Sequence, residues 1–526
     1  MKKIKNILLV LIGAVPMLVA VSSCKKFLDR KPLTATIEDL NQGALDSKVF
    51  GMYSTLRTYA GFSTLPWLDF HSIRDDDAEK GSSQTDGAEI NTEFETFQYT
   101  KDDWAPNTYW NDRYYMIAKA NETIEYGALL DQTPSVLRNL GEAYFFRAFC
   151  YFDLVRTYGE VPKIDFVIKK AADGIVAKSP TTEIYALIDA DLTKAAQYLP
   201  LNASEYGAGY TGRLTKGAAK TLWAQSYMFR QSWGQAKALC TEVVGSAQYS
   251  LTPSFVDVWK DGLNGAGKNG PESIFEMQAN CGANAQSNGA VNNGSGWGTC
   301  QSVRQGGATN TWNLGWGWNT PTDKLVTAWD NTDPRKEVTI LFSGQSDGGA
   351  VSGGYGATLP PYSISGSAGT IERKYWNKKV YSDPAMRAYT GFINGNGAAE
   401  WINHRILRYA DVLLMLAEAA NETGDGVTAA ANLELVRKRA SGNLPVTRTI
   451  VPYIPFANQA QMRQAIKNER RFEFAMEGYR FYDLVRWGDA VTELGSLGYT
   501  DRCKYYPIPQ KAIDLSGGVL KQNPAW

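Results

Sequence analysis

Histidine is almost missing from this 526-residue chain, which contains only His71 and His404. Two histidines so far apart in the sequence argue against a histidine-rich metal site. Net charge is missing as well, because 54 basic side chains balance 54 acidic ones. A neutral chain offers no electrostatic reason to bind nucleic acid. We therefore expect no cofactor and no nucleic-acid partner.

The sequence also lacks the short motifs that mark many enzymes. It has no Walker loop, no nucleophile elbow and no zinc-ligand cluster. With so many acidic residues, a glycosidase-like carboxylate pair stays open as an alternative. We expect a protein that binds a ligand and does not catalyse a reaction.

A long apolar run occurs only at the N-terminus. Three early lysines precede an uncharged apolar stretch at residues 7–21. This stretch is shorter than the about 20 residues that cross a membrane, so residues 1–23 are predicted to be a signal peptide. The small residues directly before Cys24 resemble a lipobox, in which the cysteine is lipidated and anchors the protein to a membrane. The alternative is ordinary signal cleavage near this point, with Cys24 incidental.

The remaining cysteines divide into two kinds. Cys150 and Cys240 lie in apolar helical patterns and are predicted to be buried thiols. Cys281 and Cys300 flank a segment rich in glycine and asparagine, and they form the candidate disulfide pair of an exported protein.

Helical periodicity dominates two parts of the chain. Apolar residues recur with helical spacing from about 40 to 260 and again from about 404 to 495. Small residues share one offset in the two parts, Ala224 with Ala236 and Ala417 with Ala429. Small residues let paired helices approach closely, as in tetratricopeptide-like hairpins. Antiparallel helices of another kind of α-domain are the alternative.

The segment 261–400 has a different composition. It holds 24 of the 49 glycines, and its part 281–320 carries a single charged side chain, Arg304. Such a segment cannot form regular helices, yet it is too aromatic for a solvated linker. We predict long loops with a few short strands, such as one at residues 274–277, packed on the helical scaffold as a ligand-facing insertion.

Tryptophan is the most informative residue type, with 15 copies. A sugar ring has an apolar face that fits an indole plane and a polar rim that fits nearby amide, carboxylate or guanidinium groups. Trp223 lies on an apolar helical pattern and is predicted to be core. The candidate ligand-binding residues are the four tryptophans of the charge-poor loops and Arg304, with Trp104 in a polar stretch and the weaker Trp67. The four loop tryptophans are Trp297, Trp312, Trp316 and Trp318.

An acidic run follows Arg74 and comprises Asp75, Asp76, Asp77 and Glu79. Oxygen ligands at this density could hold calcium, with Asp75, Asp77 and Glu79 as candidates, although the run lacks EF-hand spacing. A capped turn or a solvated run is the alternative. A third use is contact of Arg74 and Asp76 with ligand hydroxyls.

A second group of charges lies on neighbouring helix turns. It comprises Glu469, Arg470, Glu473, Glu477 and Arg480. A surface stripe of ion pairs is one interpretation. The many aromatic neighbours favour a partly buried structural network without a catalytic role.

Characteristic motifs spread over nearly the whole mature chain. They are Cys24 with Phe27-Leu28-Asp29, Arg147-Ala148, Tyr158-Gly159, Gly212-Arg213, Asp333-Pro334-Arg335, Arg408-Tyr409-Ala410-Asp411, Glu469-Arg470, Arg486-Trp487-Gly488 and Tyr506-Pro507-Ile508-Pro509. Through them the chain resembles the SusD/RagB family of outer-membrane lipoproteins.

The resemblance implies one mostly helical domain over residues 24–526, with tetratricopeptide-like hairpins beneath a looped ligand face. It also implies a cell-surface lipoprotein of the outer membrane that binds a glycan without cleaving it. Such a protein delivers oligo- or polysaccharide to a SusC-like TonB-dependent transporter for nutrient uptake. Part of the family handles peptides, so a peptide-binding lid is the alternative. Lys25-Lys26 stand where the family often has acidic residues, so surface export is inferred from the family alone.

Overall fold

The computed structural model describes residues 44–262, 267–279, 294–304, 312–361, 363–366, 369–385 and 401–526. The chain divides into two units. Of the first, Met1–Lys48, the described part is the first turn of helix α4 (Ala44–Thr58). The second, Val49–Trp526, contains every feature discussed below. The predicted signal peptide and Cys24 lie outside the described residues. None of the described helices is both long and apolar enough to cross a membrane.

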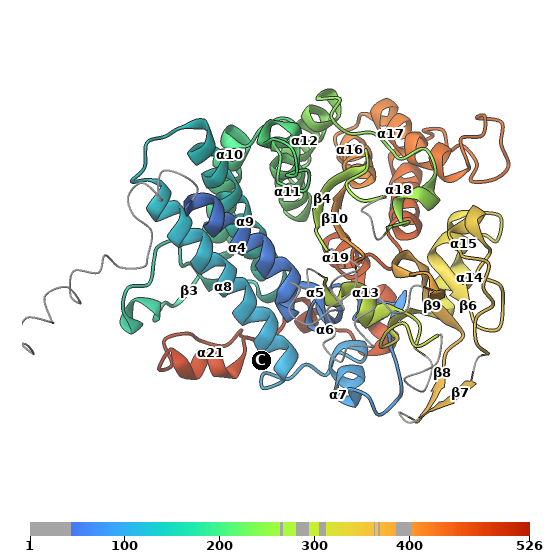
Figure 1. Ribbon diagram of the computed structural model, residues 1–526, viewed down its shortest axis with the longest axis horizontal. Helices are drawn as coiled ribbons and strands as arrows, with labels where there is room; N and C mark the ends of the chain where they lie inside the picture. Colours follow the sequence, from blue (N-terminus) through green and yellow to red (C-terminus); the bar gives the residue numbers. More distant parts are fainter. Residues whose placement is uncertain are drawn as a thin grey trace, which may run out of the picture. The chain divides into compact units, whose positions relative to one another are not determined.

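Helices form most of the regular structure, which confirms the mostly α fold class. Successive long helices of the first half pack against one another, and those of the second half continue the array through a contact between α12 and α16 (Figure 1). These helices are α8 (Trp104–Gly127), α9 (Pro134–Tyr158), α10 (Thr181–Tyr198), α11 (Lys216–Phe229), α12 (Trp233–Gly245), α16 (Tyr409–Glu422), α17 (Gly426–Ala440) and α18 (Gln459–Glu473).

Local signals in the sequence fix where these helices begin and end. The side chain of Thr133 accepts a hydrogen bond from the Val136 N–H and caps the start of α9. Gly159 ends the same helix with a φ of 75° and a ψ of −114°, a positive-φ conformation that glycine adopts without strain.

The predicted small residues lie at helix contacts. Ala224 and Ala236 are fully buried where α11 packs on α12, and Ala417 and Ala429 are fully buried where α16 packs on α17. Side chains of this size allow the close approach that a helical hairpin needs. The tetratricopeptide-like hairpin arrangement is thereby confirmed.

The described strands pair as five two-stranded antiparallel sheets. The predicted strand at 274–277 is confirmed as β4. The expectation that a helix starts at residue 404 is wrong, because residues 404–408 form strand β10, which pairs with β4, and the helix starts at Tyr409. The pairs are β1 (Ala78–Gly81) with β5 (Trp318–Pro321), β2 (Val161–Pro162) with β3 (Lys178–Ser179), β4 (Ser273–Met277) with β10 (His404–Arg408), β6 (Ile340–Phe342) with β9 (Tyr375–Asn377) and β7 (Ser363–Gly366) with β8 (Gly369–Glu372).

Short helices complete the chain between these elements. The α-helices among them are α5 (Ala60–Ser63), α6 (Leu65–Leu68), α7 (Ala88–Ile90), α13 (Gly296–Gln301), α14 (Asp323–Ala328), α15 (Arg335–Thr339), α19 (Arg480–Trp487), α20 (Ala490–Leu494) and α21 (Gln510–Leu515), and one of the short 3₁₀ turns is η8 (Lys378–Val380).

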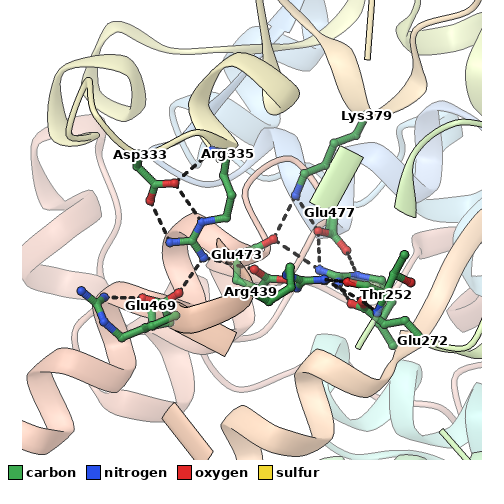
Figure 2. Close-up of polar contacts among 11 residues, drawn as sticks. Thr252, Glu272, Asp333, Arg335, Lys379, Arg439, Glu469, Glu473 and Glu477 are labelled. Atoms are coloured by element: carbon green, nitrogen blue, oxygen red, sulfur yellow. Dashed lines mark hydrogen bonds and ion pairs between the residues drawn. The ribbon is translucent and has the colours of Figure 1, made fainter. Parts of the chain in front are cut away.

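A buried ion network joins the helical scaffold to the loop-rich part of the chain (Figure 2). Glu473 of α18 lies at its centre and contacts three guanidinium groups. The predicted structural network is thus confirmed, although Arg470 and Arg480 pair elsewhere, with Asp411 and Asp76. Its charged members are Arg335, Lys379, Arg408, Arg437 and Arg439 with Glu272, Asp333, Glu469, Glu473 and Glu477.

The cysteines are buried where the structure describes them. Cys150 and Cys240 are free thiols in the core, as predicted. Cys300 is also a buried free thiol, which does not match the predicted disulfide with Cys281. Cys281 itself lies outside the described residues.

Candidate functional site

The acidic run is a buried structural element. Arg480 donates to Asp76 at 2.8 Å, and Arg471 donates to Asp77. Although burial acts to raise it, hydrogen bonds from Arg480 and Lys324 lower the pKa of Asp76 to about 2. Asp75 accepts the N–H groups of Asp77 and Ala78, so it caps a turn.

These pairings confirm the capped-turn interpretation of the acidic run and do not fit the calcium alternative. Arginine side chains occupy the oxygens of Asp76 and Asp77, and Glu79 faces Arg373 at 3.7 Å. In the parts of the chain that the structure describes, no group of three His, Cys, Asp or Glu residues could hold a metal ion. Arg74 is fully buried, with its guanidinium 3.8 Å from the ring centre of Phe481. Arg74 and Asp76 therefore serve the core and cannot contact ligand hydroxyls.

Three predicted tryptophans are also core residues. Trp297 stacks on His404 with ring centres 3.7 Å apart, and the edge of Trp67 meets Trp297 at 4.9 Å. Trp67 stacks in turn on His71. Trp318 is buried in β5 beneath Lys80, whose Nζ lies 4.9 Å from the ring centre. Burial of these rings corrects the prediction that they bind ligand.

Both histidines are buried by these aromatic contacts, and the pKa of each imidazole is lowered. Burial, followed by the charge of Arg405, lowers the pKa of His404 to about 3. Burial and nearby arginines hold the pKa of His71 well below its ordinary value. Neither imidazole is placed to exchange protons with a ligand at neutral pH.

Trp104 is exposed but lies in another part of the fold. It is the first residue of α8 and 45 % of it is exposed. Just before it, the Lys101 carbonyl accepts a hydrogen bond from Gln510 of α21. The chain just before Trp104 is thus held by the C-terminal segment.

Trp312 belongs to an aromatic group that the loops present to solvent. Its half-buried ring is parallel to the buried ring of Tyr381, with centres 6.4 Å apart. Tyr355 meets Tyr381 edge-on at 5.3 Å, and 41 % of Tyr355 is exposed. We call Trp312, Tyr355 and Tyr381 the Tyr381 cluster.

A polar group adjoins the Tyr381 cluster. Arg304 donates to Ser82 and Asp86, each at 2.5 Å, and to the carbonyl of half-buried Trp316 at 3.4 Å. The Asp86 side chain stays 40 % exposed despite this ion pair. At Gly317, φ is 73° and a Cβ atom would lie 3.0 Å from both Arg304 and Trp376. Trp376 and Val303, the residue before Arg304, share a hydrophobic cluster with Tyr381, and Trp312 packs against that cluster.

Hydrogen bonds between buried side-chain amides join α13, β5 and β9, the elements next to Arg304 and Trp316 in the sequence or in the fold. The side-chain oxygen of Gln301, the last residue of α13, accepts hydrogen bonds from Asn319 of β5 at 2.7 Å and from Asn377 of β9 at 3.0 Å. Three elements far apart in sequence are thus fixed to one another. We call Trp312, Trp316, Tyr355, Arg304 and Asp86 the candidate ligand face.

The sequence predicted Trp312, Trp316 and Arg304 but missed Tyr355 and Asp86. Tyr355 had a usable signal, since it stands among glycines in a charge-poor stretch, as the loop tryptophans do. Asp86 had none, because its partner Arg304 lies 218 positions away.

Comparison with known proteins agrees with the fold. Residues 245–501 match the model of the SusD family, and residues 26–228 match a model described as "Starch-binding associating with outer membrane". Two SusD-like proteins of Formosa agariphila are each 26% identical, one over 92% of both chains and the other over 99% of both.

Solved structures share the same architecture over most of their length. A "Laminarin binding SusD-like protein" is 26% identical with a TM-score of 0.71, covering 92% of this chain and 99% of its own. The surface glycan-binding protein A from Bacteroides fluxus is 24% identical with a TM-score of 0.73, at the same coverage. With the helical array, both matched models and these relatives in agreement, the chain belongs to the SusD family.

Proposed function

We propose that this protein captures a glycan at the cell surface by stacking and hydrogen bonding, without cleaving it. The observation that carries the proposal is the candidate ligand face, where half-buried Trp316 adjoins the Arg304–Asp86 ion pair and half-buried Trp312 packs against the hydrophobic cluster of Tyr381. Indole faces suit the C–H face of a sugar, and the charged pair suits its hydroxyls. The laminarin-binding relative supports a carbohydrate ligand.

Binding without catalysis is part of the proposal. Glycoside hydrolysis generally needs two carboxyl groups that flank the scissile bond. The acids of the buried run are held by arginines, and both histidines have a lowered pKa. These groups are not placed for acid–base work on a ligand. Incubating a bound polysaccharide with the protein should release no new reducing ends.

The anchor and the delivery step are further parts of the proposal. Cys24 would carry the lipid that holds the protein on the outer membrane, and a SusC-like TonB-dependent transporter would accept the glycan. The family description of association with the outer membrane supports this location. A Cys24→Ser variant should move from the membrane fraction to the soluble fraction, and the wild-type protein should copurify with its transporter.

A ligand panel tests the proposed function directly. The purified chain is titrated with laminarin, starch, xylan and pectin, and separately with a pool of peptides. We expect one polysaccharide to bind, and Trp312→Ala or Trp316→Ala to weaken it by about 1–3 kcal/mol, by analogy with stacking of bases on aromatic rings.

Trp223→Ala is the matched control for these variants. Trp223 is likewise half-buried, but it lies on α11, where it stacks on Tyr227 and donates to Asp189. It should leave the affinity unchanged. Binding of peptides alone would replace the glycan proposal with that of a peptide-binding lid.

A further inference from the structure

We propose that Asp347 and Lys378 are positioning residues that hold Tyr355 on the candidate ligand face. The inference rests on the proposed function, because it assigns Tyr355 to the same glycan site. Its basis is a compact loop, residues 347–356, that folds around one buried carboxylate and is tied to the helical scaffold from below.

The Asp347 carboxylate organises this loop. Its Oδ1 accepts the N–H groups of Gly349 at 3.0 Å and Gly356 at 3.1 Å, and its Oδ2 accepts the Tyr355 N–H at 2.7 Å. Only 2 % of Asp347 is exposed. Burial acts to raise its pKa, but the N–H groups outweigh burial and hold that pKa below its ordinary value. A single side chain therefore closes the loop from both ends.

The loop has no room for a side chain where it passes Asp347. A Cβ atom at Gly354 would lie 2.3 Å from the Asp347 carbonyl oxygen and 2.5 Å from its carboxyl carbon. Gly354 thus lets the chain pass directly over Asp347. The next residue, Tyr355, is turned outward by this close packing and keeps 41 % of its surface exposed.

The Asp347 carboxylate also accepts a hydrogen bond from the Tyr381 cluster. The Tyr381 hydroxyl donates to Asp347 Oδ2 at 3.2 Å, and the Tyr381 ring packs against both Tyr355 and Trp312. Asp347 consequently fixes the backbone of one exposed aromatic residue and the ring on which it rests. Asp347 thus joins the backbone of Tyr355 to the hydroxyl of the ring that Trp312 and Tyr355 both contact.

Two consecutive lysines tie the loop to the scaffold. Lys378 of η8 donates to the Asp347 carbonyl at 2.6 Å and to the Glu337 carbonyl at 2.8 Å. Its neighbour Lys379 donates to Glu477 at 2.6 Å and to the Glu473 carbonyl of α18 at 3.0 Å (Figure 2). The loop is therefore joined to the buried ion network through two adjacent lysines, and Lys260 adds a further hydrogen bond to the Ala350 carbonyl.

A preorganised loop loses less conformational entropy when a ligand binds. Tyr355 would otherwise sit in a stretch with glycine at 353, 354 and 356, which orders at high entropic cost. Asp347 and Lys378 supply that order in the free protein. They act through Tyr355 and do not themselves contact the glycan.

The test combines amide hydrogen exchange with affinity for the polysaccharide that binds among laminarin, starch, xylan and pectin. Asp347→Asn keeps the side-chain shape but replaces one acceptor oxygen with an NH₂ group facing N–H donors. We expect the amides of residues 349–356 to exchange at least about tenfold faster. Asp330→Asn is the matched control, since Asp330 caps an exposed turn by accepting from Thr332.

A double-mutant cycle separates positioning from general stability. Tyr355→Ala should weaken binding about tenfold. Asp347→Asn should weaken binding about three- to tenfold in the wild-type background and add no further loss in the Tyr355→Ala background. A loss that is equal in both backgrounds would overturn the inference. If Asp347→Asn does not fold, Tyr381→Phe, which removes one donor to Asp347, takes its place with the same pattern expected.

Failure of the inference and failure of the proposed function give different results. If the wild-type protein binds none of the four polysaccharides, the proposed function fails, and the exchange measurement alone decides the inference. Faster exchange of residues 349–356 would then still support the positioning role. Unchanged exchange in Asp347→Asn would overturn it whether or not a glycan binds.

Discussion

Replacing Glu473 with glutamine removes one negative charge from the centre of the buried ion network. Glu473 is fully buried, and its Oε1 accepts from Arg439 at 2.6 Å and from Arg408 at 3.1 Å. Its Oε2 accepts from Arg335 at 3.1 Å. Five cationic and five anionic side chains make up the network, so the substitution leaves one buried cation without its counter-charge.

The expected cost follows from that imbalance. Breaking a buried ion pair by removing one partner costs about 3–5 kcal/mol, because the remaining charge stays desolvated. That loss is a large fraction of the about 5–15 kcal/mol that stabilises a typical domain. Urea denaturation of the purified chain, followed by tryptophan fluorescence, measures the difference in the free energy of unfolding.

Glu422→Gln provides the matched control. Glu422 pairs with one arginine, Arg463, whose side chain is 39 % exposed. An ion pair at such a site contributes about 1 kcal/mol or less. Equal losses for Glu473→Gln and Glu422→Gln would refute the account of the network as a balanced, desolvated unit.

Three other predictions concern the buried groups. The unfolded chain protonates His404 near pH 6.5 whereas the folded chain does so only near 3, so acid favours unfolding. The free energy of unfolding should fall by about 1.4 kcal/mol per pH unit across this window relative to a His404→Phe variant, and parallel pH profiles would contradict the lowered pKa. EDTA should leave the melting temperature unchanged, because arginines already pair with Asp76 and Asp77; a decrease would restore the calcium hypothesis. Trp297→Ala should cost about 3–5 kcal/mol of stability through loss of its packing on His404 and Trp67, and a stable variant would contradict its role in the core.

Local patterns predicted much of the helical scaffold. The apolar period and the small residues at Ala224 and Ala417 act within one or two helix turns, so they can be read directly from the chain. Part of the buried network around Glu473 was also predictable, since Glu469, Glu473 and Glu477 stand among aromatic residues in one stretch of the sequence. Their partners Arg335, Arg408 and Arg439 are distant in sequence and were not predicted.

The candidate site was less predictable because its partners are distant in sequence. Trp297 lies in a segment whose composition is typical of an exposed loop. In the fold, His404, more than a hundred residues later in the sequence, stacks on the face of its ring. The acidic run looks like a cation site until Arg471 and Arg480 are placed beside it. Composition pointed to the loops 261–400, and only the fold separates their exposed aromatic rings from the buried ones.

The titration of the purified chain with laminarin, starch, xylan and pectin tests the central claim most directly. The account predicts that one of these polysaccharides binds, that Trp312→Ala or Trp316→Ala weakens it by about 1–3 kcal/mol, and that Trp223→Ala does not. Undiminished glycan binding in both variants of the candidate ligand face would contradict the site. Binding of peptides and of no polysaccharide would contradict the proposed function.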